Sequence, residues 1–255
     1  MKPGGSYAAD FFEPLARIEP RSFWFRARNR LIVSTIRRFF SEARSLLEVG
    51  CGTGFVLAAL HEAFPALRLV GGELYEEGLE IAQRRLPDEV ELRQLDATQM
   101  PFEKEFDVVA SFDVLEHIDD DVRVLTGMRR ALTDGGGVIL LVPQHPRLWS
   151  EADVFAQHRR RYTRAGLVGK VRGAGFEVLF SSSFVTTLLP AMVAARLVAR
   201  VRPRAYDPVR ELEPGRLNPV FERLLDAERA AIDRGLSLPA GGSLLVVARA
   251  APERG

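Results

Sequence analysis

Three glycines at alternate positions carry the clearest chemical implication in this chain. Gly50, Gly52 and Gly54 follow the apolar stretch 46–49 and precede an apolar helical pattern. Glycine permits left-handed backbone angles and a close approach of a ligand, and the N-terminus of a following helix offers unpaired N–H groups. We therefore expect this loop to bind the polar part of a nucleotide-like cofactor. The dinucleotide fingerprint GxGxxG requires glycine where this chain has Phe55, so the spacing fits a cofactor with an amino-acid moiety better than a pyrophosphate.

Two carboxylates follow the glycines at the ends of apolar segments. Glu73 comes 19 residues after Gly54, close to the roughly 20-residue offset of an acid that binds a ribose. Asp96 ends the alternating pattern of residues 90–95, and its carboxylate could accept a hydrogen bond from an adenine amino group. Together the loop and the two acids predict an adenosine-containing cofactor.

At this point residues 45–183 resemble the class I S-adenosylmethionine (SAM) dependent methyltransferases, in particular the type 11 and ubiquinone-biosynthesis O-methyltransferase groups. The resemblance implies SAM as cofactor and S-adenosylhomocysteine as its product. It rests on residues 48–54 as the first motif, Glu73 as the ribose acid, 96–97 as the adenine clamp, 106–117 as the fourth-strand motif and 132–143 as the turn into strand five.

The resemblance also implies which residues contact SAM. An arginine of the N-terminal segment, Arg28 or Arg30, would pair with the cofactor carboxylate in the bidentate way that a guanidinium permits. Glu48 would lie near the cofactor ammonium group. The predicted cofactor contacts are Arg28, Glu48, Gly50, Cys51, Gly52, Gly54, Glu73, Leu74, Asp96, Ala97, Phe112 and Asp113.

Two histidines are the candidate catalytic residues. Methyl transfer is an in-line displacement, so the protein must orient the acceptor, exclude water and, for a hydroxyl, remove a proton. His117 is the preferred general base because imidazole titrates near working pH. The alternative is that His117 only orders the loop 115–119. His145 is the competing base, or else a contact to the substrate.

The fourth-strand motif also contains a cluster of potential metal ligands. Asp113, Glu116 and His117 have i, i+3, i+4 spacing and could hold a divalent ion that lowers the pKa of a bound substrate. Hydrogen bonding within the loop explains the same three residues, so no metal ligand is predicted.

The segment 158–163 combines cations with an aromatic residue. Its three arginines could bind phosphate, carboxylate or a sugar-linked diphosphate. The alternative is a solvated helix entrance whose arginines pair with Glu151 and Asp153. Thr163 is a plausible N-cap of the helix that follows. The predicted substrate contacts are Trp24, His145, His158, Arg160 and Tyr162.

The elements that position these residues follow from hydrophobic periodicity. Apolar strands alternate with amphipathic helices from residue 45 onward, which predicts βαβ units and a parallel sheet. We expect an α/β, Rossmann-like, doubly wound fold with seven strands, mostly parallel, and an antiparallel last strand. The predicted strands lie near 45–49, 67–73, 90–95, 106–112, 136–143, 175–183 and 242–249.

Four regions result from this pattern. Residues 1–44 are expected to form a helical lid, and residues 45–184 the SAM-binding core. The proline-containing stretch 185–238 is expected to be a helical insertion that covers the substrate, and 239–255 to supply the last strand and a tail.

Composition limits the partners. The net charge of +1 gives no argument for nucleic acid, and one cysteine with no apolar leader favours the cytoplasm. Arg196, Arg200 and Arg204 recur at helical spacing in an apolar stretch, which would suit a helix on anionic lipid. Such a helix more often packs on its own domain or a second subunit, so a monomer or homodimer without membrane contact is expected.

These observations predict methyl transfer from SAM to a hydroxyl, in preference to an amine, of a small or medium-sized acceptor, including anionic, sugar-like or lipid-like ones. Three alternatives stay open. They are a non-catalytic SAM-binding regulatory or assembly subunit, a protein or RNA methyltransferase, and a nucleotide-sugar or NAD enzyme.

Overall fold

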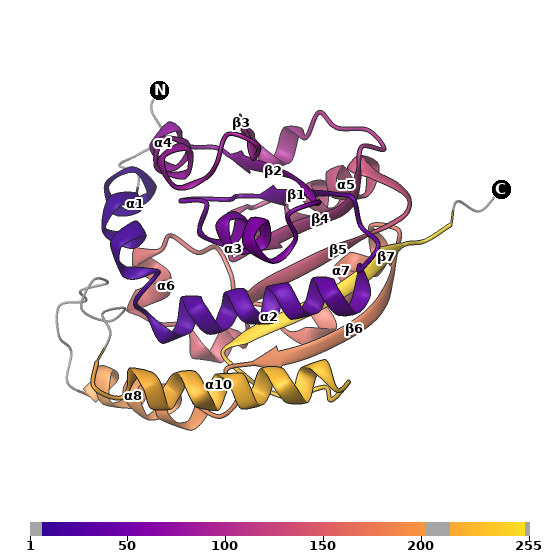
Figure 1. The fold of residues 1–255 in the computed structure, drawn as a ribbon. Helices are drawn as coiled ribbons and strands as arrows, with labels where there is room; N and C mark the ends of the chain where they lie inside the picture. Colours follow the sequence, from indigo (N-terminus) through magenta and orange to yellow (C-terminus); the bar gives the residue numbers. More distant parts are fainter. Residues whose placement is uncertain (1–6, 202–214, 253–255) are drawn as a thin grey trace.

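Seven strands form one sheet in the computed structural model, which describes residues 7–201 and 215–252. The strand order is β3-β2-β1-β4-β5-β7-β6 (Figure 1). β7 runs antiparallel between β5 and β6, and the other neighbouring pairs are parallel. This confirms the predicted fold class, including the antiparallel last strand. The strands are β1 Ser45–Val49, β2 Arg68–Glu73, β3 Glu91–Gln94, β4 Phe106–Phe112, β5 Leu132–Pro143, β6 Phe176–Phe184 and β7 Ser243–Ala250.

All seven predicted strands are present, and β5 departs most from its predicted start. It begins at Leu132, four residues before the predicted residue 136. Leu132 pairs with Phe106, whereas Gly137 pairs with Val108, so the two strands change register between these pairs. Gly135 lies in this irregular stretch with a φ of +79°. In a sequence, glycine at this position indicates a turn, so the strand was predicted to begin after it.

Helices cover both faces of the sheet because alternate strand residues point to opposite sides. Leu46 of β1 belongs to the apolar core under α2, α3 and α10, while Leu47 belongs to the core under α5 and α7. The helices on the first face are α2 Phe23–Phe39, α3 Phe55–Ala63, α4 Glu76–Arg85 and α10 Asn218–Asp233; on the second face they are α5 Asp121–Ala131 and α7 Arg164–Gly173.

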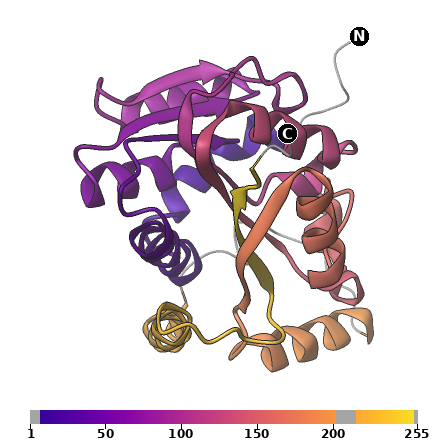
Figure 2. The same ribbon diagram turned by 90° about the vertical axis from the view of Figure 1, so that its right-hand side faces the viewer.

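The helices α2 and α10 lie side by side, as Figures 1 and 2 both show. Arg30 Nε donates to Asp226 Oδ1 at 2.8 Å, Arg26 pairs with Glu222, and the rings of Phe23 and Phe221 meet edge to face. The helix α10 is therefore anchored along α2 and next to β6.

The remaining elements surround the carboxyl ends of the parallel strands. They are α1 Tyr7–Ile18, α6 Glu151–Phe155, α8 Leu189–Val201 and the 3-10 turns Ala97–Gln99, Leu115–His117 and Pro146–Leu148. The Thr163 side chain accepts a hydrogen bond from the Gly166 N–H, which confirms the predicted N-cap of α7.

In the described part of the chain, no helix is both long and apolar enough to cross a membrane. The arginine pattern that suggested an interfacial helix is only partly described. The Arg200 side chain and all of Arg204 lie outside the described residues.

Candidate functional site

The glycine loop joins β1 to α3 in a conformation that requires glycine. Gly50, Gly52 and Gly54 have φ angles of +76°, +53° and +73°, all in the left-handed region that side chains with a Cβ rarely adopt. The N–H groups of Gly50 and Cys51 both donate to the Gly72 carbonyl, at 2.7 and 3.0 Å. The loop is therefore tied to the end of β2, and α3 begins directly behind it with Gly54 as its N-cap.

Glu73 connects the glycine loop to the end of β2. One carboxylate oxygen accepts from the Gly52 N–H at 2.9 Å, and the other accepts from the N–H groups of Leu74 and Tyr75. Burial raises the pKa of Glu73, and these three N–H donors act in the opposite direction. A carboxylate has about four acceptor sites, so Glu73 can hold the loop and still accept a hydroxyl.

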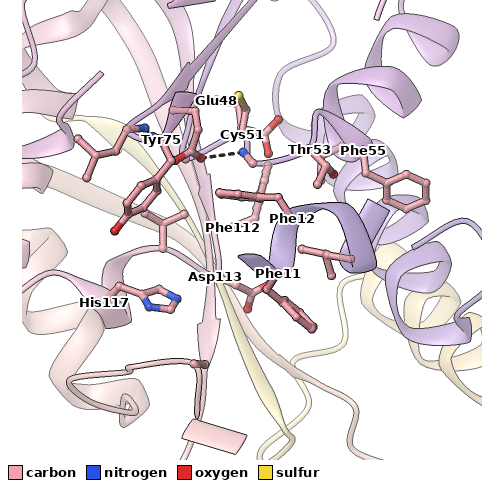
Figure 3. A pocket seen from close by; sticks show the side chains of 18 of the residues that line it. Phe11, Phe12, Glu48, Cys51, Thr53, Phe55, Tyr75, Phe112, Asp113 and His117 are labelled. Carbon is pink, nitrogen blue, oxygen red and sulfur yellow. Dashed lines mark hydrogen bonds between the residues drawn. The ribbon is translucent and has the colours of Figure 1, made fainter. Parts of the chain in front are cut away.

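A cavity of about 580 Å³ opens next to this loop at the carboxyl ends of β1, β2 and β4. Its floor contains Glu48, Glu73 and Asp96, and its roof contains Phe11 and Phe12 of α1 together with Trp24 of α2. In Figure 3 Phe112 and Asp113 lie between the Glu48 end of the cavity and His117. The carboxyl ends of parallel strands are where open α/β sheets bind ligands.

The roof helix α1 is held to the glycine loop by a buried ion pair. Arg85 of α4 donates to Glu19 at 2.6 Å and also to the carbonyl and hydroxyl of Thr53. The Thr53 hydroxyl in turn donates to Glu19. Phe11 meets Phe155 of α6 edge to face at 5.7 Å, so α1 contacts both sides of the cavity.

Three charged groups meet in the middle of the cavity. Arg28 Nη1 donates to Asp113 Oδ2 at 2.7 Å, and its guanidinium lies 4.8 Å from the Trp24 ring centroid. Asp113 has a φ of +57°, where Asp is tolerated better than most residues. Glu48 is buried, and among the described residues its Oε2 has no hydrogen-bond partner.

Burial raises the pKa of Glu48 to about 8, and the nearby Arg28 only partly offsets this. The pKa of this acid is higher in the folded chain than in the unfolded chain. At pH values between these two pKa values, the folded chain therefore binds more protons. Stability therefore falls as pH rises through this window and levels off above the folded pKa.

We expect Glu48→Gln to remove this pH dependence. Between pH 6.5 and 8 the wild-type free energy of unfolding should fall by about 1.5 kcal/mol relative to the variant, as measured by urea unfolding. Burial, and then the charge of His158, lower the pKa of His117 to about 4. His117 therefore makes stability rise with pH, opposite to the effect of Glu48, but only below about pH 6.5. Parallel stability curves for the two proteins would show that Glu48 is ionised in the fold.

Asp96 is preorganised at the far side of the cavity floor. Its carboxylate accepts from the N–H and hydroxyl of Thr98 and from the Gln99 amide. The Thr98 hydroxyl hydrogen bond is the main reason that the pKa of Asp96 is lowered. The predicted contacts Cys51, Leu74, Ala97 and Phe112 also line the cavity.

The opposite end of the cavity carries two imidazoles. His117 and His158 both line it, and their rings meet edge to face with centroids 4.7 Å apart. The neighbouring lining residues are Ile118, Gln157 and Arg159, and the Arg159 side chain is 57% exposed. This end is therefore more polar than the aromatic roof.

Four predicted site residues lie outside the cavity lining. Gly54 packs instead against Ala82 of α4 and Leu86, which directly follows that helix. The Tyr162 hydroxyl is buried and donates to Asp121 at 2.7 Å, and Arg160 also pairs with Asp121. His145 has a φ of +63° and follows β5 beside Tyr162.

All three arginines of segment 158–163 make ion pairs, Arg159 with Asp119 at 3.7 Å. Arg161 donates to Asp153 at 2.6 Å, as the solvated-entrance alternative expected, whereas Arg160 pairs with Asp121 rather than Glu151. Arg159 is the arginine of this segment that lines the cavity. No described residue of the segment 185–238 lines it, and α10 of that segment packs along α2 on the first face of the sheet.

Sequence reasoning missed several lining residues. Phe11, Phe12 and Glu19 of the N-terminal segment and Gln157 after α6 all line the cavity, and Arg159 lines it where Arg160 was predicted to. The adjacent phenylalanines of the amphipathic N-terminal segment 7–18 are a usable signal for a roof. Gln157 carries no comparable local signal.

Residues 47–140 match the family described as methyltransferase domain. The chain is similar to a ubiquinone biosynthesis O-methyltransferase of Pseudomonas paraeruginosa, with 29% identity over 154 residues, which cover 58% of this chain and 61% of that protein. It is also similar to the ubiquinone/menaquinone biosynthesis C-methyltransferase UbiE of Desulfotalea psychrophila, with 30% identity over 39% of this chain and 41% of that protein. The chain thus spans less than two thirds of the length of these relatives.

Solved structures share the fold at low identity. A chain in the complex of the Haloferax volcanii Trm112 methyltransferase activator with a methyltransferase has a TM-score of 0.65 and 19% identity, covering 97% of this chain and 99% of that one. The [4+2]-cyclase SpnF has a TM-score of 0.59 and 19% identity, covering 89% of this chain and 82% of that one. A phosphoethanolamine N-methyltransferase of Haemonchus contortus in complex with SAM also matches, with a TM-score of 0.65 and 17% identity. This match covers 98% of this chain and 61% of that one.

Proposed function

Since residues 47–140 place the chain in the class I SAM-dependent methyltransferase family, we propose that it transfers a methyl group from SAM to a hydroxyl of a small or medium-sized acceptor. The observation that carries this proposal is the cavity that joins the glycine loop and its acids to the two imidazoles. Its volume of about 580 Å³ lies within the range of small-molecule sites, roughly 300–1,000 Å³.

The residues at the glycine end fit SAM. Glu48 is buried and lines the cavity, and its Oε2 has no hydrogen-bond partner among the described residues. The ammonium group of SAM would donate to this oxygen. Arg28 is the arginine suited to the cofactor carboxylate, because Arg30 is paired with Glu222 and Asp226 on the other side of α2. Glu73 would hold the ribose and Asp96 the adenine. SAM supplies a methyl group on a sulfonium, and the protein residues bind and orient it.

The imidazole end supports the preference for an oxygen acceptor. A hydroxyl must lose its proton as the new O–C bond forms and the S–C bond breaks, and an imidazole can take that proton. One ring nitrogen of His117 donates to the Ala156 carbonyl, and its lowered pKa keeps the ring neutral near pH 7. Arg159 beside it supports an acceptor that carries an anionic group.

The activity is tested with SAM and a panel of phenols, catechols and hydroxy acids, with methylated products detected by mass spectrometry. We expect His117→Ala to lower the single-turnover rate about a hundredfold, within the usual contribution of acid–base catalysis. His61→Ala on α3, which does not line the cavity, is the matched control and should keep the wild-type rate. Equal rates in both variants would contradict imidazole chemistry, and no calorimetric heat with SAM or S-adenosylhomocysteine would contradict the whole proposal.

A small-molecule acceptor, a cytoplasmic location and a monomer or homodimer belong to the same proposal. The single cysteine, Cys51, is buried, which suits a reducing compartment. Cell fractionation and light scattering would test the last two points.

A further inference from the structure

Three potential metal ligands converge where the carboxyl end of β4 meets the loop after α6. The ligand atoms of Glu116, His117 and His158 all lie within 4.8 Å of one another, and His158 Nε2 is 3.9 Å from Glu116 Oε1. The cluster differs from the one that the sequence spacing suggested. Asp113 pairs with Arg28 and is not part of the cluster, whereas His158, from a separate segment of the chain, is.

Both histidines have one ring nitrogen already fixed. His158 Nδ1 is hydrogen-bonded to Asp153 Oδ1 at 2.9 Å, which leaves Nε2 toward Glu116. One nitrogen of His117 donates to the Ala156 carbonyl. Metal-binding histidines almost always have such an outer partner, because it sets the tautomer and the ring orientation. Asp153 is itself held by Arg161 and by the Ser150 N–H, so the outer shell is rigid.

Glu116 is the least satisfied polar side chain of the cluster. It is fully buried, and both carboxylate oxygens have no hydrogen-bond partner among the described residues. Because buried polar atoms are nearly always paired, two open carboxylate oxygens beside two imidazoles favour a cation as their partner.

We propose that Glu116, His117 and His158 bind one divalent transition-metal ion, such as Zn²⁺ or Fe²⁺, at the acceptor end of the cavity. Two imidazoles and one carboxylate favour these ions over Mg²⁺ or Ca²⁺, which prefer oxygen ligands. Metal–ligand distances of roughly 2.1 Å in a tetrahedral site place ligand atoms about 3.3 Å apart, so small side-chain rotations close the present spacing. His117 and His158 line the cavity, so coordination positions not taken by the three side chains open toward a substrate.

The consequence for catalysis rests on the proposed function. A cation at this point lowers the pKa of an acceptor hydroxyl placed beside it, and the proton leaves to solvent. His117 then ligates the cation instead of acting as the base. The metal and base roles of His117 exclude each other, so the experiment must measure metal binding without turnover.

The test titrates Co²⁺ into chelator-treated full-length protein without SAM or acceptor and records the d–d absorption. We expect one Co²⁺ per chain, displaced by Zn²⁺ but not by Mg²⁺. Glu116→Gln, close in shape to the protonated acid, should weaken binding at least a hundredfold, and Asp153→Asn about 10- to 100-fold. Zn²⁺ should also raise the thermal unfolding temperature of wild type but not of Glu116→Gln. A cooperative thermal transition of Glu116→Gln without metal, close to that of wild type, checks that the variant is folded.

The two remaining histidines of the chain are matched controls. His61→Ala and His145→Ala each remove one imidazole outside the cluster and should bind Co²⁺ like wild type. No cobalt band in wild type, or equal weakening in controls and cluster variants, overturns the inference. Heat of S-adenosylhomocysteine binding, measured on the same sample, separates this failure from failure of the proposed methyltransferase function.

Discussion

Gly50→Ala is expected to reduce the affinity for S-adenosylhomocysteine at least a thousandfold, measured by calorimetry. A Cβ at this position would lie 2.3 Å from Cγ2 of Val114, which itself lines the cavity, at a backbone φ of +76°. Real Cβ atoms do not approach so closely, so either Val114 or the loop must move. Because Gly50 and Cys51 both hydrogen-bond to Gly72, a displaced loop would also lose its place beside Glu73.

Gly135→Ala provides a control with the same backbone strain and no steric clash. Gly135 has a φ of +79°, and nothing lies within 4 Å of a Cβ built on it. This variant should lose about 1–2 kcal/mol of stability from the left-handed backbone alone and bind S-adenosylhomocysteine like wild type. If Gly50→Ala also bound normally, close approach at the glycine loop would not be what the cofactor requires.

The second large effect is expected for Glu73→Ala, which should weaken S-adenosylhomocysteine binding on the order of a thousandfold. The carboxylate accepts three backbone N–H groups and, in the proposed complex, a ribose hydroxyl. Hydrogen bonds to charged groups contribute about 1.5–3 kcal/mol each, and two or three lost contacts give this magnitude. Glu73→Gln keeps one acceptor oxygen and should fall between the variant and wild type.

Glu77→Ala is the matched control for this experiment. It removes a carboxylate from the exposed first turn of α4, four residues after Glu73, without touching the glycine loop. Its affinity should equal that of wild type at the same ionic strength. A similar loss in both variants would mean that local negative charge, and not the Glu73 hydrogen bonds, governs cofactor binding.

The shared cavity of the glycine loop and the three acids could be predicted because its parts are local in sequence. A loop of alternate glycines has few allowed conformations, and acids at strand ends must face the same edge of a parallel sheet. Glu48, Glu73 and Asp96 consequently line one cavity in the structure. The predicted strand positions hold for the same reason, since apolar periodicity fixes which residues a sheet buries.

The choice between Arg28 and Arg30 could not be made from the sequence. The two residues are neighbours on one helix, but positions i and i+2 point to different sides. Because α10 packs against α2, Arg30 forms ion pairs with α10, whereas Arg28 lines the cavity and pairs with Asp113. That packing joins segments 196 residues apart, so no local pattern contains it.

The sequence by itself determined the sheet, the strand that carries each acid and the loop that requires glycine, because these follow from short-range periodicity and backbone sterics. Only the tertiary structure decided the other end of the cavity. Asp113 meets Arg28 instead of a metal cluster, and Glu116 meets His158, which the sequence had assigned to a cation segment. Such contacts depend on how helices and loops from distant parts of the chain pack over the sheet, and packing energy is not encoded in any one segment.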